Sequence, residues 1–226
     1  SENYIGIYWR EQEPGYLAGV VAASLSETGH IATVGGTAVI PPVVNYIEGY
    51  AEGARSVNPD IDVTVAYVSE AADAAAFADP AGGATFTQQL LAQDPEIDVV
   101  FQVAGLTGNG VLQAACDAGI KAIGVDVDQY VSTPETAECT IVSAEKKLSK
   151  NVNDAIVSIV EGNPSPGINV LGLDTEDVGL SSFHEFEDLI SDETREAIAA
   201  AEAGIVDGSI QPCELNDVGL CVQTLP

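Results

Sequence analysis

A glycine-rich turn stands where α/β proteins commonly hold ligands. Residues 101–110 read FQVAGLTGNG, in which an apolar strand pattern meets three glycines and then the helical pattern VLQAACDAG. Gly105 would let the backbone approach a ligand closely, and Gly108 and Gly110 would allow a tight start to the helix. The spacing is neither GxGxxG nor GxxxxGK[ST], and no Lys or Arg follows. We therefore expect a neutral polar ligand here rather than a phosphate; an ordinary strand-to-helix turn is the alternative.

A carboxylate ends the next apolar run. Asp126 closes IGVD, and a carboxylate at the tip of a buried strand can accept hydrogen bonds from adjacent hydroxyls, as on a ribose or another sugar. The alternative is a helix N-cap or a surface turn. We expect Asp128 and Gln129, which follow in VDQ, to be solvated or to form a hinge.

Three further side chains have both a binding and a structural interpretation. Phe77 lies in an Ala/Gly-rich stretch and could stack on a flat ring or pin the loop to the core. Trp9 ends the first apolar run and could line a site or belong to the core. Lys146 follows the run TIVSAE and could face a ligand or be an ordinary surface lysine.

The cysteines and histidines do not form a pattern typical of catalysis or of metal binding. The two histidines cannot be placed in a Ser-His-Asp or Cys-His arrangement, so we expect no enzyme. The four cysteines lack metal-site spacing, so we expect neither a metal nor a cofactor. Cys213 and Cys221 bracket a short polar loop, and a disulfide there would staple a tail with little core, as in extracytoplasmic proteins. For Cys116 and Cys139 we expect buried free thiols.

Short β-branched runs alternate with longer helical patterns, which predicts an α/β fold with a mainly parallel sheet. Strands are predicted at 4–9, 31–35, 63–68, 99–104, 122–126, 140–143 and 169–172. Helices are predicted at 14–27, 42–56, 84–93, 108–118, 145–161 and 192–206. Two stretches, 69–86 and 126–140, do not fit the alternation. Long loops at the carboxyl ends of parallel strands are where open α/β sheets bind ligands.

The charge is strongly acidic. The chain has 35 Asp and Glu against 7 Lys and Arg, a formal net charge of −28. Such a field repels nucleic acid, and it suggests adaptation to high salt, where self-repulsion is screened. No apolar run approaches the roughly 18–20 residues that span a bilayer. Because the chain has no Met and opens directly in a strand pattern, we expect that its true N-terminus has been lost.

The order of six motifs resembles the basic membrane protein family, substrate-binding lipoproteins of ABC transporters that include purine-nucleoside receptors. The motifs are EQEPGYLAGVVAA, GHIATVGG, PPVVNYIEGYAEGARSVNPDI, FQVAGLTGNGVLQAACDAGIKAIGVDVDQ, VNDAIVSIVEG and VLGLDTEDVGL. The resemblance implies a type I periplasmic-binding-protein fold. In that fold, two doubly wound parallel-sheet lobes are joined by crossover strands and close on a ligand between them.

The resemblance also implies roles for individual residues. Phe77 matches an aromatic residue that stacks on the base, and Asp126 matches a ribose-binding aspartate. Lys146 matches a lysine of the family's site, and the family's V-A-G-G-T-G loop matches 103–108, with Leu106 in place of the second glycine. Our candidate ligand-binding residues are therefore Trp9, Phe77, Ala104, Gly105, Asp126 and Lys146.

The resemblance implies a longer segment before the point where this chain starts, so we expect the first lobe to be incomplete here. We assign 1–10 to a remnant of lobe one, 11–127 to lobe two, 128–162 to a crossover and return, and 163–226 to the final crossover, last helix and tail. The expected function is an extracytoplasmic, lipid-anchored solute-binding protein that delivers a purine nucleoside to an ABC permease. The alternative is a cell-surface structural or assembly protein that reuses the fold.

Overall fold

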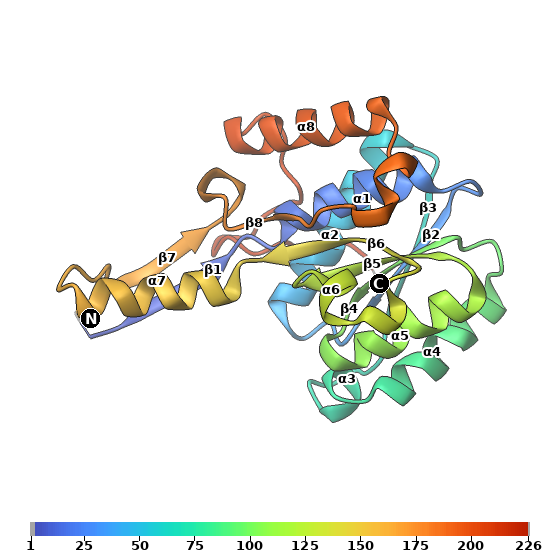
Figure 1. Cartoon of the computed structure of the whole chain (residues 1–226), viewed down its shortest axis with the longest axis horizontal. Coiled ribbons are helices and arrows are strands. Elements are labelled where there is room, and N and C mark those ends of the chain that lie inside the picture. The colour runs from blue at the N-terminus through green and yellow to red at the C-terminus, as the bar shows by residue number, and fades with distance from the viewer. Residues whose placement is uncertain (1–2, 226) are drawn as a thin grey trace.

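The structure, a computed structural model, describes residues 3–225 and is dominated by a six-stranded sheet (Figure 1). The strand order is β3-β2-β4-β5-β6-β8, and only the pairing of β8 with β6 is antiparallel. The strands are β2 (His30–Gly35), β3 (Asp62–Tyr67), β4 (Val99–Val103), β5 (Lys121–Asp126), β6 (Thr140–Lys146) and β8 (Val178–Leu180). The first five confirm the predicted strands. β8 was not predicted, because three residues with a central glycine carry no strand signal.

The six predicted helices are all present, within a few residues of the predicted bounds. They are α1 (Gln12–Leu25), α2 (Pro41–Val57), α4 (Pro80–Gln93), α5 (Gly105–Ala118), α7 (Leu148–Val160) and α8 (Asp192–Asp207). Short helical turns occupy the two stretches that did not fit the alternation: α3 (Ala74–Phe77), α6 (Gln129–Ser132) and the 3-10 turn η1 (Pro134–Thr136). Two further 3-10 turns, η2 (Leu173–Thr175) and η3 (His184–Leu189), lie near β8.

Helices cover both faces of the large sheet, because its central strands are apolar on both sides (Figure 1). Along β4, Phe101 belongs to the core shared with α1 and α2, whereas Val100 belongs to the core shared with α5. The rings of Tyr46 and Tyr50 lie 6.0 and 5.1 Å from the Phe101 ring, centroid to centroid. Helix α8 packs on the outer side of α1.

Helices α1 and α2 cross at backbone contact. Each contributes two glycines spaced four apart, namely Gly15 and Gly19, and Gly49 and Gly53. A Cβ added at Gly53 would lie 2.9 Å from Tyr16 Cα, and one added at Gly15 would lie 3.0 Å from Tyr46 Cα. Because no side chain can be accommodated between the helices, the residues at their N-terminal ends are held close together.

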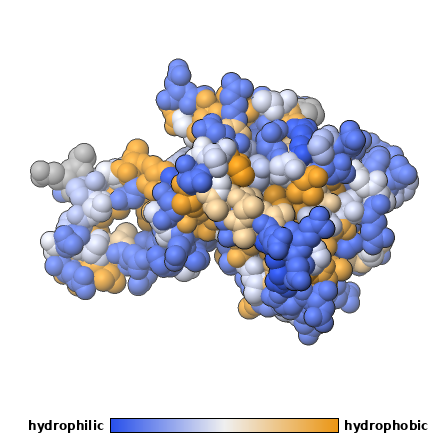
Figure 2. All heavy atoms as spheres, turned by 90° about the horizontal axis from the view of Figure 1, so that it is seen from above, coloured by the Kyte–Doolittle hydropathy of each residue, from blue (hydrophilic) through white to orange (hydrophobic). Residues whose placement is uncertain are grey.

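An arm extends from the main body (Figure 1). In it β1 (Ile5–Trp9) pairs in parallel with β7 (Gly167–Leu171), which confirms both predicted strands, and α7 lies beside them. Several apolar side chains of the arm are exposed: Tyr4, Val152, Ile156, Val157, Ile159, Val160, Ile168 and Val170. Apolar atoms are visible on the surface of this arm among hydrophilic ones (Figure 2). No helix of residues 3–225 is long and apolar enough to cross a membrane.

Both cysteine pairs form disulfides. The Cys213–Cys221 bond confirms the prediction for the tail. The expectation of free thiols at Cys116 and Cys139 was wrong, because these residues are also bonded, with their Cα atoms 5.4 Å apart. The end of α5 packs on η1, and Sγ of both cysteines lies within 3.5 Å of the Thr136 carbonyl oxygen, which brings the two sulfurs together.

Candidate ligand-binding site

The candidate residues gather at the carboxyl edge of the large sheet. Parallel pairing aligns Gly35 at the end of β2 with Val103 at the end of β4, and Asp126 at the end of β5 with Glu145 near the end of β6. Since ligands of open α/β sheets bind outside these strand ends, the topology places the predicted residues on the expected side.

A lysine lies at the centre of one group of candidates. Lys146 Nζ lies 3.1 Å from Asp126 Oδ1 and 3.5 Å from Glu11 Oε1. The same nitrogen lies 5.6 Å from the centre of the Trp9 ring and 5.5 Å from that of Tyr46, within the range of a cation–π contact. Two carboxylates and two aromatic faces therefore fix the amine, whose side chain is 11% exposed.

Glu11, which the sequence interpretation missed, is the buried member of this group. It is 2% exposed and precedes α1. Burial raises the pKa of its carboxyl, while the charge of Lys146 and a hydrogen bond from Asn45 act in the opposite direction. Burial, together with the charges of Asp126 and Glu11, also keeps the pKa of Tyr46 well above its usual value. Tyr46 therefore stays neutral and donates a hydrogen bond to the Ala144 carbonyl oxygen.

Asp126 adopts an unusual backbone conformation. Its φ is +68°, in the left-handed region that Asp tolerates better than most side chains. The side chain is 39% exposed. Its Oδ1 atom is paired by charge with Lys146 but makes no hydrogen bond of ordinary geometry within the described chain. Oδ1 itself is buried, so a ligand can reach this carboxylate only from the exposed part of the side chain.

Phe77 forms a second group with glycine backbone. It ends α3, is half-buried, and packs against the edge of the core. A Cβ at Gly36 would lie 2.9 Å from Phe77 Cζ, and one at Gly105 would lie 3.6 Å from Phe77 Cδ1. The ring thus rests on the ends of β2 and β4, next to the predicted loop. Leu106, at the position where the resemblance implies a glycine, is 61% exposed.

The glycines of FQVAGLTGNG do not all have the predicted role. Helix α5 begins at Gly105, which has a φ of +55°, so Gly108 and Gly110 lie inside the helix rather than in a turn. A Cβ at Gly108 would lie 3.0 Å from Gln102 Nε2, and one at Gly110 would lie 2.7 Å from Ala84 N. These two glycines allow close packing against β4 and α4.

Two buried glutamine side chains hold the backbone at the carboxyl ends of β4 and β5. Gln129 is 5% exposed, which corrects the expectation that it is solvated. Its Oε1 accepts hydrogen bonds from Gln102 Nε2 and from the Val125 backbone N–H, at 2.5 and 2.8 Å. Gln102 Oε1 accepts one from the backbone N–H of Ala104, at 3.0 Å. This network fixes the backbone of both the β4 and β5 ends.

Asp128 does not join the Lys146 group. Its Oδ2 lies 2.7 Å from His184 Nε2, and the His184 ring stacks on Tyr130 at a centroid distance of 4.1 Å. The carboxylate two residues after Asp126 is therefore already partnered.

One cluster in the described chain has the composition of a metal site. Ligand atoms of His30, Asp94 and Glu96 all lie within 4.8 Å of one another. The His30 ring is already occupied, with Nδ1 3.1 Å from Asp94 and Nε2 3.5 Å from Glu96. The hydrogen bond to Asp94 raises the pKa of His30, as expected for a surface ion pair.

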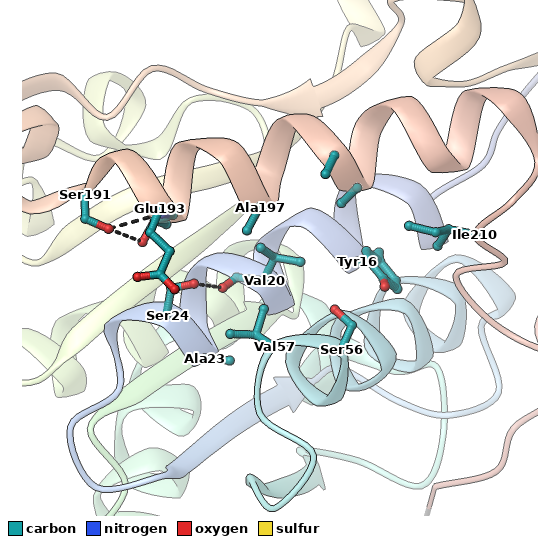
Figure 3. Close-up of a pocket in the computed structure, with 13 residues that line it drawn as sticks. Tyr16, Val20, Ala23, Ser24, Ser56, Val57, Ser191, Glu193, Ala197 and Ile210 are labelled. Atoms are coloured by element: carbon teal, nitrogen blue, oxygen red, sulfur yellow. Dashed lines mark hydrogen bonds between the residues drawn. The ribbon is translucent and has the colours of Figure 1, made fainter.

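A separate groove of about 630 Å³ lies between α1, α2 and α8 (Figure 3). Two of its hydroxyl groups are engaged locally: Ser24 Oγ donates to the Val20 carbonyl oxygen, and Ser191 Oγ caps α8 by accepting from the Thr194 backbone N–H. The groove has none of the candidate residues in its lining. We therefore place the candidate site at the strand edge.

Comparison with known proteins agrees with this architecture. Residues 1–214 match the model of the Bmp family, described as ABC transporter substrate-binding protein PnrA-like. The chain is 30% identical over 228 residues to the ABC transporter nucleoside-binding protein BmpA of Lactococcus lactis, covering 93% of this chain and 60% of that protein. It is 29% identical over 211 residues to basic membrane protein A of Borreliella burgdorferi, covering 92% and 58%.

Solved structures show the same fold. A solute-binding protein of an ABC transporter system from Aeropyrum pernix K1 superposes with a TM-score of 0.81 at 25% identity, covering 93% of this chain and 66% of that one. The chain thus spans about three-fifths of the length of its curated relatives and shares the periplasmic-binding-protein fold. The chain belongs to the basic membrane protein family of PnrA-like ABC transporter substrate-binding proteins.

Proposed function

We propose that this chain is part of an extracytoplasmic solute receptor that binds a purine nucleoside and presents it to an ABC permease. The observation that carries the proposal is the Asp126–Lys146 pair, held at the carboxyl edge of the sheet beside Trp9. Asp126 offers an acceptor and Lys146 a donor, the combination that vicinal ribose hydroxyls require.

The second group supplies a complementary surface for a base. Stacking of a base on an aromatic ring contributes about 1–3 kcal/mol, and Phe77 is half-buried against the glycine backbone of the β2 and β4 ends. A nucleoside is neutral, so the net charge of −28 does not oppose its binding as it would oppose a nucleotide. The name of the Lactococcus lactis relative supports the same ligand class.

Membrane attachment and the permease partner belong to this proposal. Two disulfides in the chain fit an oxidising, extracytoplasmic compartment. We propose a lipid anchor outside the present sequence as the means of attachment, and a permease that recognises the ligand-loaded receptor.

Isothermal titration of the protein as its organism makes it, with guanosine, adenosine, inosine, 2′-deoxyguanosine and ribose, tests the ligand. We expect Asp126→Ala to weaken nucleoside binding by about 10–100-fold, the loss associated with a hydrogen bond to a charged group. The matched control is Asp128→Ala, since that carboxylate is held by His184 and not by Lys146. Absence of binding by every nucleoside, or equal losses in both variants, would contradict the proposal.

A further inference from the structure

We propose that the C-terminal tail, residues 213–225, which the Cys213–Cys221 disulfide closes, helps to position the ligand site. Asn45 is the positioning residue that connects the tail to this site. The inference rests on the proposed function, because the site it supports is the Asp126–Lys146 pair. It is carried by an unbroken series of contacts from the tail to Lys146, all through buried or nearly buried groups.

The tail is fastened to α2 by two buried polar side chains. The Cys221 backbone N–H donates to Asn45 Oδ1 at 3.0 Å. The backbone N–H groups of Thr224 and Leu225 donate to Glu48 Oε1 at 2.8 and 3.0 Å, and Thr224 Oγ1 donates to Glu48 Oε2 at 2.6 Å. Asn45 is fully buried and Glu48 is 3% exposed. These hydrogen bonds determine where the tail lies.

The disulfide closes the part of the tail that faces Asn45. The tail has no helix or strand. Its internal contacts include the Cys213–Cys221 disulfide, an isolated bridge between Leu215 and Cys221, and a turn in which Asn216 Oδ1 accepts hydrogen bonds from the backbone N–H groups of Val218 and Leu220. Without the covalent bond, ordering this segment on α2 would cost more conformational entropy, and the hydrogen bonds to Asn45 and Glu48 would have to offset that cost alone. The disulfide therefore keeps the donor in front of Asn45.

The amide nitrogen of Asn45, Nδ2, connects the tail to the ligand site. It donates to Glu11 Oε2 at 3.1 Å and to the Tyr8 hydroxyl oxygen at 3.3 Å. Because Oδ1 faces an N–H donor and Nδ2 faces two acceptors, only one orientation of the amide satisfies all its partners. Rotation of the amide would place its oxygen against the Glu11 carboxylate.

Glu11 completes the series. One of its oxygens is held by Asn45, and the other lies 3.5 Å from Lys146 Nζ. If Asn45 is removed, or if the Cys221 N–H that orients it is displaced, the buried Glu11 carboxylate loses a donor. It then no longer holds the Lys146 amine in the same place. Lys146 would then move relative to the Trp9 ring and Asp126, and the ligand site would be distorted without any change in a ligand-contacting residue.

The fluorescence of Trp9 measures the effect of these contacts without any ligand. Trp9 is the sole Trp of the chain, and Lys146 Nζ lies 5.6 Å from its ring centre, so its emission maximum and quenching depend on the position of the amine. The variants are Asn45→Leu and the double change Cys213→Ser/Cys221→Ser. The control is Cys116→Ser/Cys139→Ser, which removes the disulfide between α5 and the residue just before β6.

We expect both test variants to shift Trp9 emission and to weaken nucleoside binding about fivefold, the typical net effect of losing one intramolecular hydrogen bond. Combined, they should shift emission no further than Asn45→Leu alone, because both act through one contact. The control should lower stability and leave emission and affinity unchanged. Unchanged emission in the tail variant, additive shifts, or an equal shift in the control would overturn the inference. If no nucleoside binds the wild-type protein, the emission measurements still decide it.

Discussion

Replacing Lys146 with Met tests the electrostatics of the site directly. Met keeps much of the length of the lysine stem and removes the charge. The change leaves Glu11, which is 2% exposed, with Asn45 as its remaining side-chain partner. Asp126, whose side chain is 39% exposed, contributes less to the loss than the buried Glu11.

The expected loss of unfolding free energy in Lys146→Met follows from the burial of Glu11. Breaking one side of a buried ion pair costs about 3–5 kcal/mol, because the remaining charge is uncompensated. Glu11 can avoid part of this cost by binding a proton, since burial already raises its pKa above its ordinary value. Folding then becomes more favourable as pH falls, by at most about 1.4 kcal/mol per pH unit between the unfolded and folded pKa values.

Urea unfolding of the wild type, Lys146→Met, Glu11→Gln and the double variant, each at about pH 8 and about pH 5, measures this. We expect the Lys146→Met loss to be largest at the higher pH and mostly recovered by adding Glu11→Gln. The control is Arg55→Met, whose pair with Glu52 is exposed on both sides and worth at most about 1 kcal/mol. A loss that is equal at both pH values and is not recovered in the double variant would refute the reasoning.

Three further outcomes are expected. Gly53→Ala should lower the free energy of unfolding by about 1–3 kcal/mol through overpacking against α1, and an unchanged urea midpoint would show that the helices can separate. Burial raises the pKa of Glu11 and Glu13 above their ordinary value of 4.5, so both bind protons better when folded. Thermal scans should therefore show stability rising as pH falls from neutral toward that ordinary value; a fall over the same range would contradict this. Replacing Cys116 and Cys139 with Ser should cost about 3 kcal/mol for a bond with a sequence separation of 23, and urea unfolding that matches the wild type would be inconsistent with a disulfide.

Local sequence patterns were enough to predict most of the fold. The β-branched runs and their turn residues located seven strands, because strand propensity and burial act together in a parallel sheet. Strand β8 (Val178–Leu180) was missed because its pairing with β6, rather than its composition, makes it a strand. The start of α5 was placed too late, because a glycine that packs against a neighbour has the same sequence signal as one that forms a turn.

The site was less predictable from the residues alone. Asp126 and Lys146 could each be proposed from a strand end, but their ion pair depends on the register between β5 and β6. Nothing in the run REQE distinguishes Glu11 from its neighbours, because its partners Lys146 and Asn45 lie far along the chain. Such long-range contacts are set by the α1–α2 crossing and the sheet topology, which no local window contains.

The left-handed backbone at Asp126 implies a conflict between folding and function. Glycine adopts a φ of +68° without the penalty of about 1 kcal/mol or more that a side chain incurs there. A library selected for folding alone should therefore accumulate glycine at this position, whereas one selected for solute uptake should keep aspartate. Comparing the two populations by deep sequencing would measure how strongly uptake, as opposed to fold, maintains this residue.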